Sequence, residues 1–358
     1  MKYNFFLNDK KFILDLYKVN KAKPIKKGLI SYLKINDDCN LKCDYCFQKS
    51  DNKIKKIIKL REYIQIISKI KQSSDKIYLF GGEPLLLKNY ENIRYLLESK
   101  INLRIFTNGT FEKCILDLLL ENHRYIDKLI FALDGTEETH NSRKNVAINS
   151  FQKSIYNIKS INGRIKFEIQ INIDKTNIDT IFDLISYIIN TIPLKDKGYN
   201  IVLNRLMKVK GEISELELVN LYIKIKDKFN NKNILVNSVV VNKLATYFEH
   251  NKIDIDRCNI RNIKVYDFSK EIIYRCPQNE YKTITNRFHR QKVYEDNKNN
   301  LMSNLRNGKL CLKCIFQPFC NKGCLWEDKI KYPECKENLN IIITKILDKA
   351  DYFFYLEK

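Results

Sequence analysis

The sequence is short of proline, glycine and long apolar runs. Its 358 residues include only six prolines and ten glycines, and, with no internal repeat, this excludes a low-complexity linker. No run approaches the ~18 apolar residues that a membrane helix needs. Near the N-terminus, Asn8, Asp9, Lys10 and Lys11 interrupt any apolar core of a secretion signal. We therefore expect a cytoplasmic protein that has no membrane partner.

The charge of the chain is strongly positive. Lys and Arg number 64 against 42 Asp and Glu, which gives a formal net charge of +22. Such a charge attracts nucleic acid or acidic peptides. Lysine is nevertheless spread along the whole chain among isoleucine and asparagine, a pattern typical of a genome-wide codon bias. We do not expect nucleic acid as a partner, while an acidic peptide remains open.

Between residues 31 and 210, strand and helix patterns alternate along the chain. Strands are expected at 29–35, 76–80, 103–107, 128–133, 165–173 and 200–206, with helices near 54–67, 89–99, 111–120, 150–161 and 178–192. This order predicts an α/β fold with a parallel sheet and right-handed crossovers. Six units are too few for an eight-fold barrel, so we expect a partial, TIM-like (β/α)6 barrel. Its functional groups should lie at the carboxyl ends of the strands.

Four further parts flank this barrel. Residues 1–30 are expected to form a β-hairpin, residues 211–255 a helical linker, and residues 256–340 a cysteine-rich domain. Residues 341–358 are expected to form a C-terminal helix, because a helical pattern resumes near residue 339.

Three cysteines, Cys39, Cys43 and Cys46, follow the first strand of the barrel. A loop with these spacings can wrap one corner of a [4Fe–4S] cluster, and three thiolates leave one iron open for a small ligand. Structural zinc prefers four closed ligands, and no fourth Cys or His lies nearby in the sequence. In a reducing compartment the eleven cysteines of the chain are expected to be metal ligands instead of disulfides.

This loop resembles the signature of the radical S-adenosylmethionine (SAM) superfamily. The resemblance implies that the open iron binds the amino and carboxylate groups of SAM, and that Tyr45 lies against the adenine. The next strand ends in Gly81, Gly82, Glu83 and Pro84, which match the second motif of the family. The two glycines let the backbone approach the ligand, and Glu83 or nearby carbonyls can accept hydrogen bonds from the SAM ammonium.

Further candidates lie at the ends of later strands. Asn108 ends the third strand, and Asp134 with its glycine ends the fourth, followed by His140 and Arg143. Peptide-modifying members of the family carry a similar series. By this resemblance Arg143 is a candidate partner of the SAM carboxylate, the alternative being a solvated surface charge. His140 is expected to be a structural hydrogen-bonding residue, and Asn172, near the end of the fifth strand, is expected to reach the ribose.

A second group of cysteines lies in the last third of the chain. Its C-x2-C-x5-C-x3-C core resembles the SPASM domain, which carries two auxiliary [4Fe–4S] clusters; zinc is the alternative. The resemblance implies one cluster on Cys311, Cys314, Cys320 and Cys335, and another on Cys258, Cys276 and Cys324. A non-cysteine group completes the second cluster, or one of its irons is open to substrate. Cys114 fits neither set and is expected to be buried as an apolar residue.

Taken together, these motifs imply a radical SAM enzyme of the peptide or protein maturase type, with SAM and three [4Fe–4S] clusters as cofactors. The expected substrate is a ribosomally made precursor peptide that receives a thioether or carbon–carbon cross-link. The expected electron donor is an external flavodoxin or ferredoxin. The N-terminal hairpin is too short for a leader-recognition domain, so a separate leader-recognition protein is a further expected partner.

Two alternatives use the same residues. Anaerobic sulfatase maturases, which form formylglycine from Cys or Ser, resemble this chain but place an Asp general base directly after the second upstream cysteine; here Pro277 stands there. An iron–sulfur electron carrier would explain the cysteines but not the turn at Gly81 to Pro84. No catalytic residue is assigned from the sequence.

Overall fold

The computed structural model describes most of the barrel and parts of the flanking segments. The described residues are 2–7, 10–15, 23–24, 28–48, 58–145, 149–195, 198–207, 209–250, 252–253, 262–274, 284–287, 316, 319 and 334–354. The predictions for Cys258, Cys276, Cys311, Cys314, Cys320 and Cys324 lie outside the described residues.

A ten-stranded sheet forms the centre of the molecule, in the order β10-β9-β8-β7-β6-β5-β4-β12-β13-β14. Its neighbours from β10 to β12 pair in parallel, and the last two pairs are antiparallel. The parallel strands are β4 (Ile30–Lys34), β5 (Lys76–Phe80), β6 (Leu103–Thr107), β7 (Ile126–Ala132), β8 (Phe167–Ile173), β9 (Tyr199–Arg205), β10 (Ile234–Asn237) and β12 (Ile263–Asp267). The others are β13 (Ile272–Tyr274) and β14 (Ile284–Arg287).

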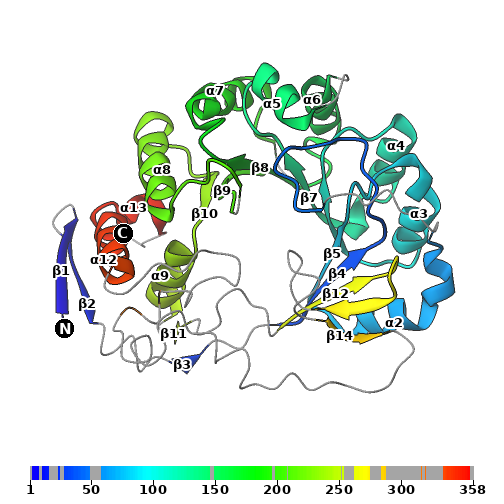
Figure 1. Cartoon of the computed structure of the whole chain (residues 1–358), viewed down its shortest axis with the longest axis horizontal. Coiled ribbons are helices and arrows are strands. Elements are labelled where there is room, and N and C mark those ends of the chain that lie inside the picture. Colours follow the sequence, from blue (N-terminus) through cyan, green and yellow to red (C-terminus); the bar gives the residue numbers. More distant parts are fainter. Residues whose placement is uncertain are drawn as a thin grey trace.

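The sheet curves into an open arc with helices around its outer side (Figure 1). The helices are α2 (Ile64–Ser73), α3 (Tyr90–Glu98), α4 (Lys113–Glu121), α5 (Glu137–Lys144), α6 (Ser150–Ile161), α7 (Ile181–Thr191), α8 (Glu215–Phe229) and α9 (Val239–His250). Short 3-10 turns are η1 (Leu60–Tyr63), η2 (Leu87–Asn89), η3 (His123–Tyr125) and η4 (Ile178–Thr180). The predicted partial barrel is confirmed.

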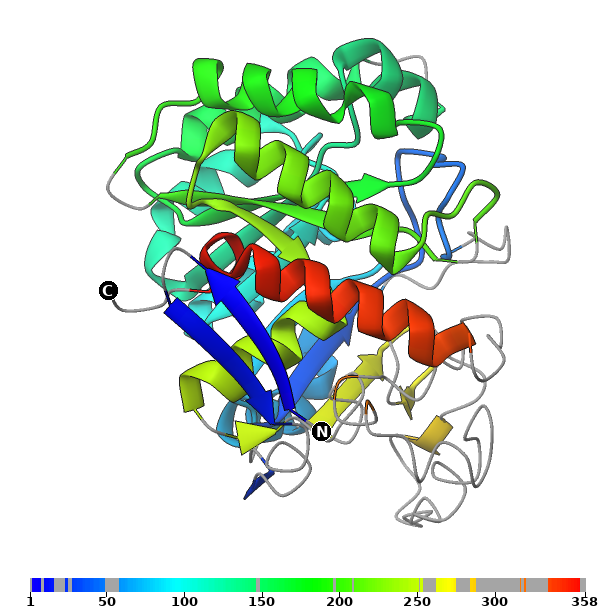
Figure 2. The same ribbon diagram turned by 90° about the vertical axis from the view of Figure 1, so that its left-hand side faces the viewer.

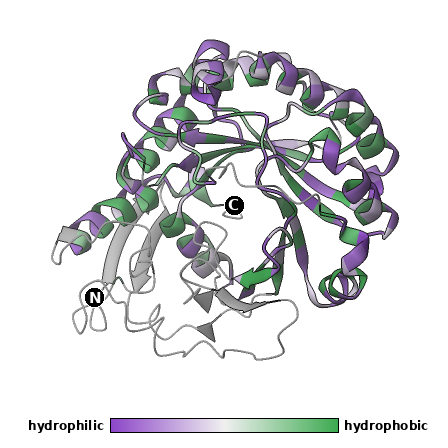
Figure 3. Cartoon of the chain, turned by 45° about the vertical axis from the view of Figure 1, so that its right-hand side comes forward, coloured by the Kyte–Doolittle hydropathy of each residue, from purple (hydrophilic) through white to green (hydrophobic). Residues whose placement is uncertain are grey.

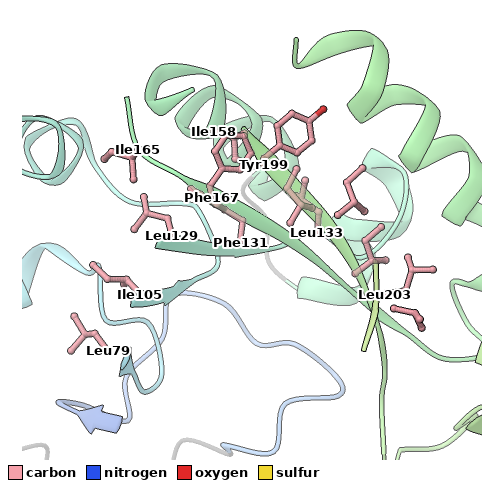
Figure 4. Packing of buried hydrophobic residues seen from close by; sticks show 14 of the residues in the cluster. Leu79, Ile105, Leu129, Phe131, Leu133, Ile158, Ile165, Phe167, Tyr199 and Leu203 are labelled. Atoms are coloured by element: carbon pink, nitrogen blue, oxygen red, sulfur yellow. The ribbon is translucent and has the colours of Figure 1, made fainter. Parts of the chain in front are cut away.

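Alternation along the strands separates two faces of the arc. In β8 the residues Phe167, Ile169 and Ile171 are buried, while the residues between them are half-exposed. The buried set packs under the helices with apolar side chains of neighbouring strands (Figure 4). The helices of the ring accordingly have a hydrophobic and a hydrophilic side (Figure 3). The residues between them point to the opposite face of the sheet, on the inside of the arc.

The ends of the chain pack beside the arc. Strands β1 (Lys2–Leu7) and β2 (Lys10–Asp15) form the predicted antiparallel hairpin, and β3 (Lys23–Pro24) pairs with β11 (Lys252–Ile253). The C-terminal helix α12 (Glu334–Asp348) starts before the expected residue and contains Cys335; α13 (Ala350–Phe353) follows it. Figure 2 shows α12 lying between the hairpin and the barrel.

Several elements were not expected, and β10 and α5 are two of them. The segment 211–255, predicted as a helical linker, also contains β10, which extends the sheet by pairing with β9. Helix α5 follows β7, where the sequence indicated only site residues. Among the described residues, none of the helices has both the length and the apolar character needed to cross a membrane.

Candidate functional site

The cysteine loop leaves the carboxyl end of β4. The thiol of Cys39 is exposed, and those of Cys43 and Cys46 are partly buried. The amide of Cys46 donates to the carbonyl of Cys43 (3.1 Å), which forms a tight turn between the last two cysteines. The Sγ of Cys39 accepts hydrogen bonds from the amide of Leu41 (3.4 Å) and from Nδ2 of Asn108 (3.7 Å). These donors favour the thiolate, the form that binds metal, but burial outweighs them and raises the pKa of Cys39 to about 11.

The chemistry of the three thiols fits an iron–sulfur cluster. Cysteine thiolates are the usual ligands of a [4Fe–4S] cluster, one on each iron, so the ligands stand apart. A zinc ion would need its ligands about 2.0–2.3 Å from one centre. Within the described part of the chain, no three His, Cys, Asp or Glu side chains are grouped in that way. As sulfur donors, Cys39, Cys43 and Cys46 fit the expected cluster.

The Gly81 to Pro84 turn packs directly against the cysteine loop. A Cβ on Gly82 would lie 2.1 Å from the carbonyl oxygen of Asp38, and one on Gly81, at φ +148°, would lie 2.5 Å from that of Asn36. Across this contact the amide of Glu83 donates to the carbonyl of Asp38 (2.7 Å). Both positions therefore need glycine because the turn and the cysteine loop are in direct backbone contact. That the backbone of the turn also approaches SAM stays a prediction.

Glu83 ties the ends of two strands together. Its side chain is buried, with 1% of the residue exposed. The carboxylate accepts hydrogen bonds from the amide of Leu85 (2.9 Å), the hydroxyl of Thr107 (2.9 Å) and the amide of Asn108 (2.7 Å). Burial raises the pKa of Glu83 to about 7, against the opposing effect of these donors. The carboxylate is held within the fold, and contact with the SAM ammonium stays a prediction.

Asn108 connects the end of β6 to the cysteine loop. In addition to the contact with Cys39, its Nδ2 donates to Oδ1 of Asn40 (2.9 Å). Its Oδ1 accepts from both the amide (2.9 Å) and the hydroxyl (2.6 Å) of Thr110. The structure therefore brings Asn108 beside the first predicted ligand.

The C-terminal end of α5 forms a third contact with the loop. The carbonyls of Arg143 and Lys144 accept hydrogen bonds from the amides of Asp44 (3.2 Å) and Lys42 (3.0 Å). The Nζ of Lys144 donates to Oδ2 of Asp134 (2.6 Å) and to the hydroxyl of Tyr45 (2.7 Å). The Tyr45 hydroxyl also hydrogen-bonds to Asp134. We call Tyr45, Asp134 and Lys144 the buried triad.

Both charges of the buried triad are almost fully enclosed, with Lys144 1% and Asp134 0% exposed. Burial disfavours each charge, yet Asp134 raises the pKa of Lys144 well above its ordinary value. In the same way Lys144 outweighs burial and lowers the pKa of Asp134. The pair is therefore ionised at neutral pH. Sequence reasoning did not single out Lys144, although its place directly after Arg143 in the Asp-Gly, His, Arg series was a usable signal.

The remaining predicted residues surround Asp134. Arg143 is buried and pairs with Asp174 (2.8 Å), with its guanidinium 4.9 Å above the Tyr45 ring. The alternative of a solvated surface charge is therefore wrong, because an acid at the end of β8 neutralises Arg143 inside the fold. Pairing with the SAM carboxylate stays a prediction. The amide of Asn172 donates to Oδ1 of Asp134 (3.1 Å), and its contact with the ribose likewise stays a prediction.

His140 has the structural role that was expected. Its Nδ1 accepts from the amide of Asp134 (3.2 Å), and its ring packs edge-on against Phe151. Burial lowers the pKa of His140 to about 3, so the ring is neutral. Cys114, by contrast, is exposed, and its predicted burial is wrong. The apolar side of α4 is supplied by other residues: Ile115, Leu116, Leu118 and Leu119.

Residues 33–188 match the family model of the radical SAM superfamily. This chain carries a radical SAM domain. The matched range holds the cysteine loop, the Gly81 to Pro84 turn and the buried triad, so the three contacting segments belong to one domain.

Curated relatives match less than half of this chain. A protein of Methanocaldococcus jannaschii, described as a glycyl-radical enzyme activating enzyme, is 27% identical over 44% of this chain and 62% of its own length. A GTP 3′,8-cyclase of Clostridium perfringens is 30% identical over 44% of this chain and 51% of its own length. The sporulation killing factor maturation protein SkfB of Bacillus subtilis is 24% identical over 44% of this chain and 39% of its own length. The chain thus spans little more than half the length of the first two relatives.

Solved structures extend the similarity in fold. SuiB of Streptococcus suis, bound to its precursor peptide SuiA, superposes with a TM-score of 0.63 at 19% identity, covering 86% of this chain and 74% of SuiB. The protein anSMEcpe with bound AdoMet superposes with a TM-score of 0.69 at 17% identity, covering 90% of this chain and 95% of that one. At these identities the likeness establishes the fold.

Proposed function

We propose that this protein is a radical SAM enzyme that modifies a ribosomally made peptide, by a thioether or carbon–carbon cross-link. The assignment of radical SAM chemistry rests on one observation: three segments of the radical SAM domain are in contact around Cys39, Cys43 and Cys46. When bound, the cluster supplies the electron that cleaves SAM to methionine and a 5′-deoxyadenosyl radical. The chain holds the loop, with SAM expected near Tyr45, Gly81 to Pro84, Asn108, Arg143 and Asn172.

The peptide substrate rests on two supports. SkfB is named as a maturation protein, and SuiB is named with its precursor peptide. The second support is the SPASM-like spacing of Cys311, Cys314, Cys320 and Cys324, with Cys258, Cys276 and Cys335 as further proposed ligands of two auxiliary clusters. Cross-linking removes two hydrogens from the peptide. One hydrogen would go to the radical as an atom, and the other would leave as a proton, with an auxiliary cluster as the acceptor of the remaining electron.

The proposed organisation follows from these roles. We propose residues 31–210 as the SAM-cleaving domain and 256–340 as the auxiliary-cluster domain. A flavodoxin or ferredoxin would deliver the electrons, and a separate protein would present the leader of the peptide. Formylglycine formation is the second candidate, and the absence of an Asp at Pro277 disfavours it.

SAM cleavage tests the first half of the proposal. Anaerobically reconstituted protein with dithionite should release 5′-deoxyadenosine from SAM, and a triple variant with Cys39→Ala, Cys43→Ala and Cys46→Ala should release none. Cys114→Ala is the matched control, because it removes an exposed cysteine outside all three proposed ligand sets, and it should cleave SAM as the wild type does. Equal cleavage by the triple variant would refute the assignment.

Mass spectrometry tests the peptide half. A short open reading frame found beside this gene would supply the probe, as a peptide co-expressed with the enzyme. Loss of two hydrogens per cross-link is expected. A cysteine that exchanges sulfur for oxygen and loses two hydrogens, or a serine whose fragment ions carry the whole two-hydrogen loss on that one residue, would support formylglycine formation instead. An unchanged peptide mass beside active SAM cleavage would overturn the assigned substrate.

A further inference from the structure

A buried cation lies between α5 and the loop that carries the predicted cluster ligands. We propose that Lys144 is a positioning residue whose positive charge, held by Asp134 and Tyr45, raises the reduction potential of the cluster on Cys39, Cys43 and Cys46. This inference rests on the proposed function, because it needs a cluster at those cysteines.

The geometry fixes Lys144 relative to the loop at two levels. Its side chain contacts Tyr45, which lies between Cys43 and Cys46, at 2.7 Å. Its backbone carbonyl accepts the amide of Lys42 at 3.0 Å. The last carbonyls of a helix have no partner within the helix, so the loop satisfies groups that α5 leaves open. Movement of the loop would therefore break contacts of both kinds.

The cation of the pair has the larger contact with the loop. The Nζ of Lys144 lies 5.2 Å from the centroid of the Tyr45 ring, in addition to its hydrogen bond with the Tyr45 hydroxyl and the contact of its carbonyl with Lys42. Asp134 contacts the loop through the Tyr45 hydroxyl, and its Oδ1 accepts the amide of Asn172 near the end of β8. The loop is therefore packed against the positive member of the pair on two sides and against the carboxylate at one atom.

This packing has a consequence for electron transfer. Reduction adds one negative charge to a cluster that already carries thiolates, and a nearby cation in a water-poor environment favours that charge. Net charge and hydrogen bonding around a cluster are among the factors that set its potential. Asp134 offsets part of the effect, so loss of Lys144 alone should act more strongly than loss of both charges.

The test compares the potential of the cluster among variants. The variants are Lys144→Met, the charge-free double variant Lys144→Met with Asp134→Asn, and Lys128→Met as the matched control. Lys128 forms a similar ion pair with Glu168 (2.8 Å), but inside the arc and earlier on β7 than the carboxyl end. Each protein is reconstituted anaerobically, its iron is counted, and redox titration follows the electron paramagnetic resonance signal that changes when SAM is added.

The inference predicts an order of midpoint potentials among the variants. The midpoint potential of Lys144→Met should shift to a more negative value, the double variant should fall between it and the wild type, and Lys128→Met should match the wild type. A loaded Lys144→Met with unchanged potential overturns the inference. If this variant holds no cluster, the double variant decides: a more negative potential supports the inference, and the wild-type potential overturns it. A wild type without any SAM-sensitive signal would refute the proposed function itself.

Discussion

At the scale of single residues, Glu83 shows that a motif residue expected to bind a ligand can form hydrogen bonds within the fold. Glu83 or nearby carbonyls were expected to accept hydrogen bonds from SAM. In the structure the Glu83 carboxylate accepts three hydrogen bonds from the chain itself. The motif identified the right residue, but the sequence does not reveal which partners a buried carboxylate takes. That choice depends on Leu85, Thr107 and Asn108 reaching the same point from two strand ends.

The raised pKa of Glu83, about 7, makes stability depend on pH. Between the ordinary carboxyl pKa and about 7, the folded state holds a proton that the unfolded state has released, so the free energy of unfolding should decrease as pH rises through this window. Glu83→Gln removes that slope. It should also destabilise the fold by about 1–3 kcal/mol, because an amide NH2 then faces a backbone donor.

Urea unfolding at several pH values checks this prediction. Glu112→Gln, which alters an exposed residue, serves as the control and should keep the wild-type slope. A Glu83→Gln variant with the same pH slope as the wild type would contradict the role of Glu83.

At the scale of elements, the strands could be predicted from sequence and α5 could not. The strand patterns are strong because apolar residues recur wherever a strand packs under helices, as along β8. Helix α5 has no such stripe. It buries His140, Arg143 and Lys144 by pairing each with a hydrogen-bonding or charged partner, and hydrophobic periodicity cannot detect this. The four residues of β10 are likewise too few to show a pattern, and pairing with β9 decides their structure.

The contact between the turn after β5 and the cysteine loop predicts the effect of Gly82→Ala. Its Cβ would meet backbone atoms of Asp37 and Asp38, which cannot move aside as a side chain could. We expect a lower melting temperature and a lower iron content after reconstitution.

Gly198→Ala is the control that distinguishes backbone strain at a positive φ from collision of a new Cβ with neighbouring backbone. At Gly198 a Cβ would make only an ordinary contact, 3.9 Å from the carbonyl oxygen of Lys195, but φ is +50°, so an alanine costs about 1–2 kcal/mol. The Gly82 variant should lose more stability than this control and should also lose iron. Equal losses, with full iron content in both variants, would show that the contact does not shape the loop.

At the scale of the whole molecule, a buried ion pair joins distant parts of the chain. Strand β12 pairs with β4, and Lys34 reaches Asp267 across this junction at 3.0 Å. Lys34 is also paired with Asp37. Because both members of the long-range pair are buried, removal of one leaves a charge poorly compensated.

Asp267→Ala should therefore destabilise the protein by about 3 kcal/mol. Chemical denaturation measures this loss. The control is Glu98→Ala, which breaks the exposed pair with Arg94 and should cost no more than about 0.5 kcal/mol. Similar small losses in both variants would mean that the junction of β4 and β12 does not depend on this pair.

The proposed function depends most directly on where the iron binds. We would measure iron and sulfide per chain after anaerobic reconstitution, for the wild type and for the triple variant with Cys39→Ala, Cys43→Ala and Cys46→Ala. Three four-iron clusters predict about 12 irons falling to about 8. An iron content that is the same in both proteins would contradict the central claim that these three cysteines hold a cluster.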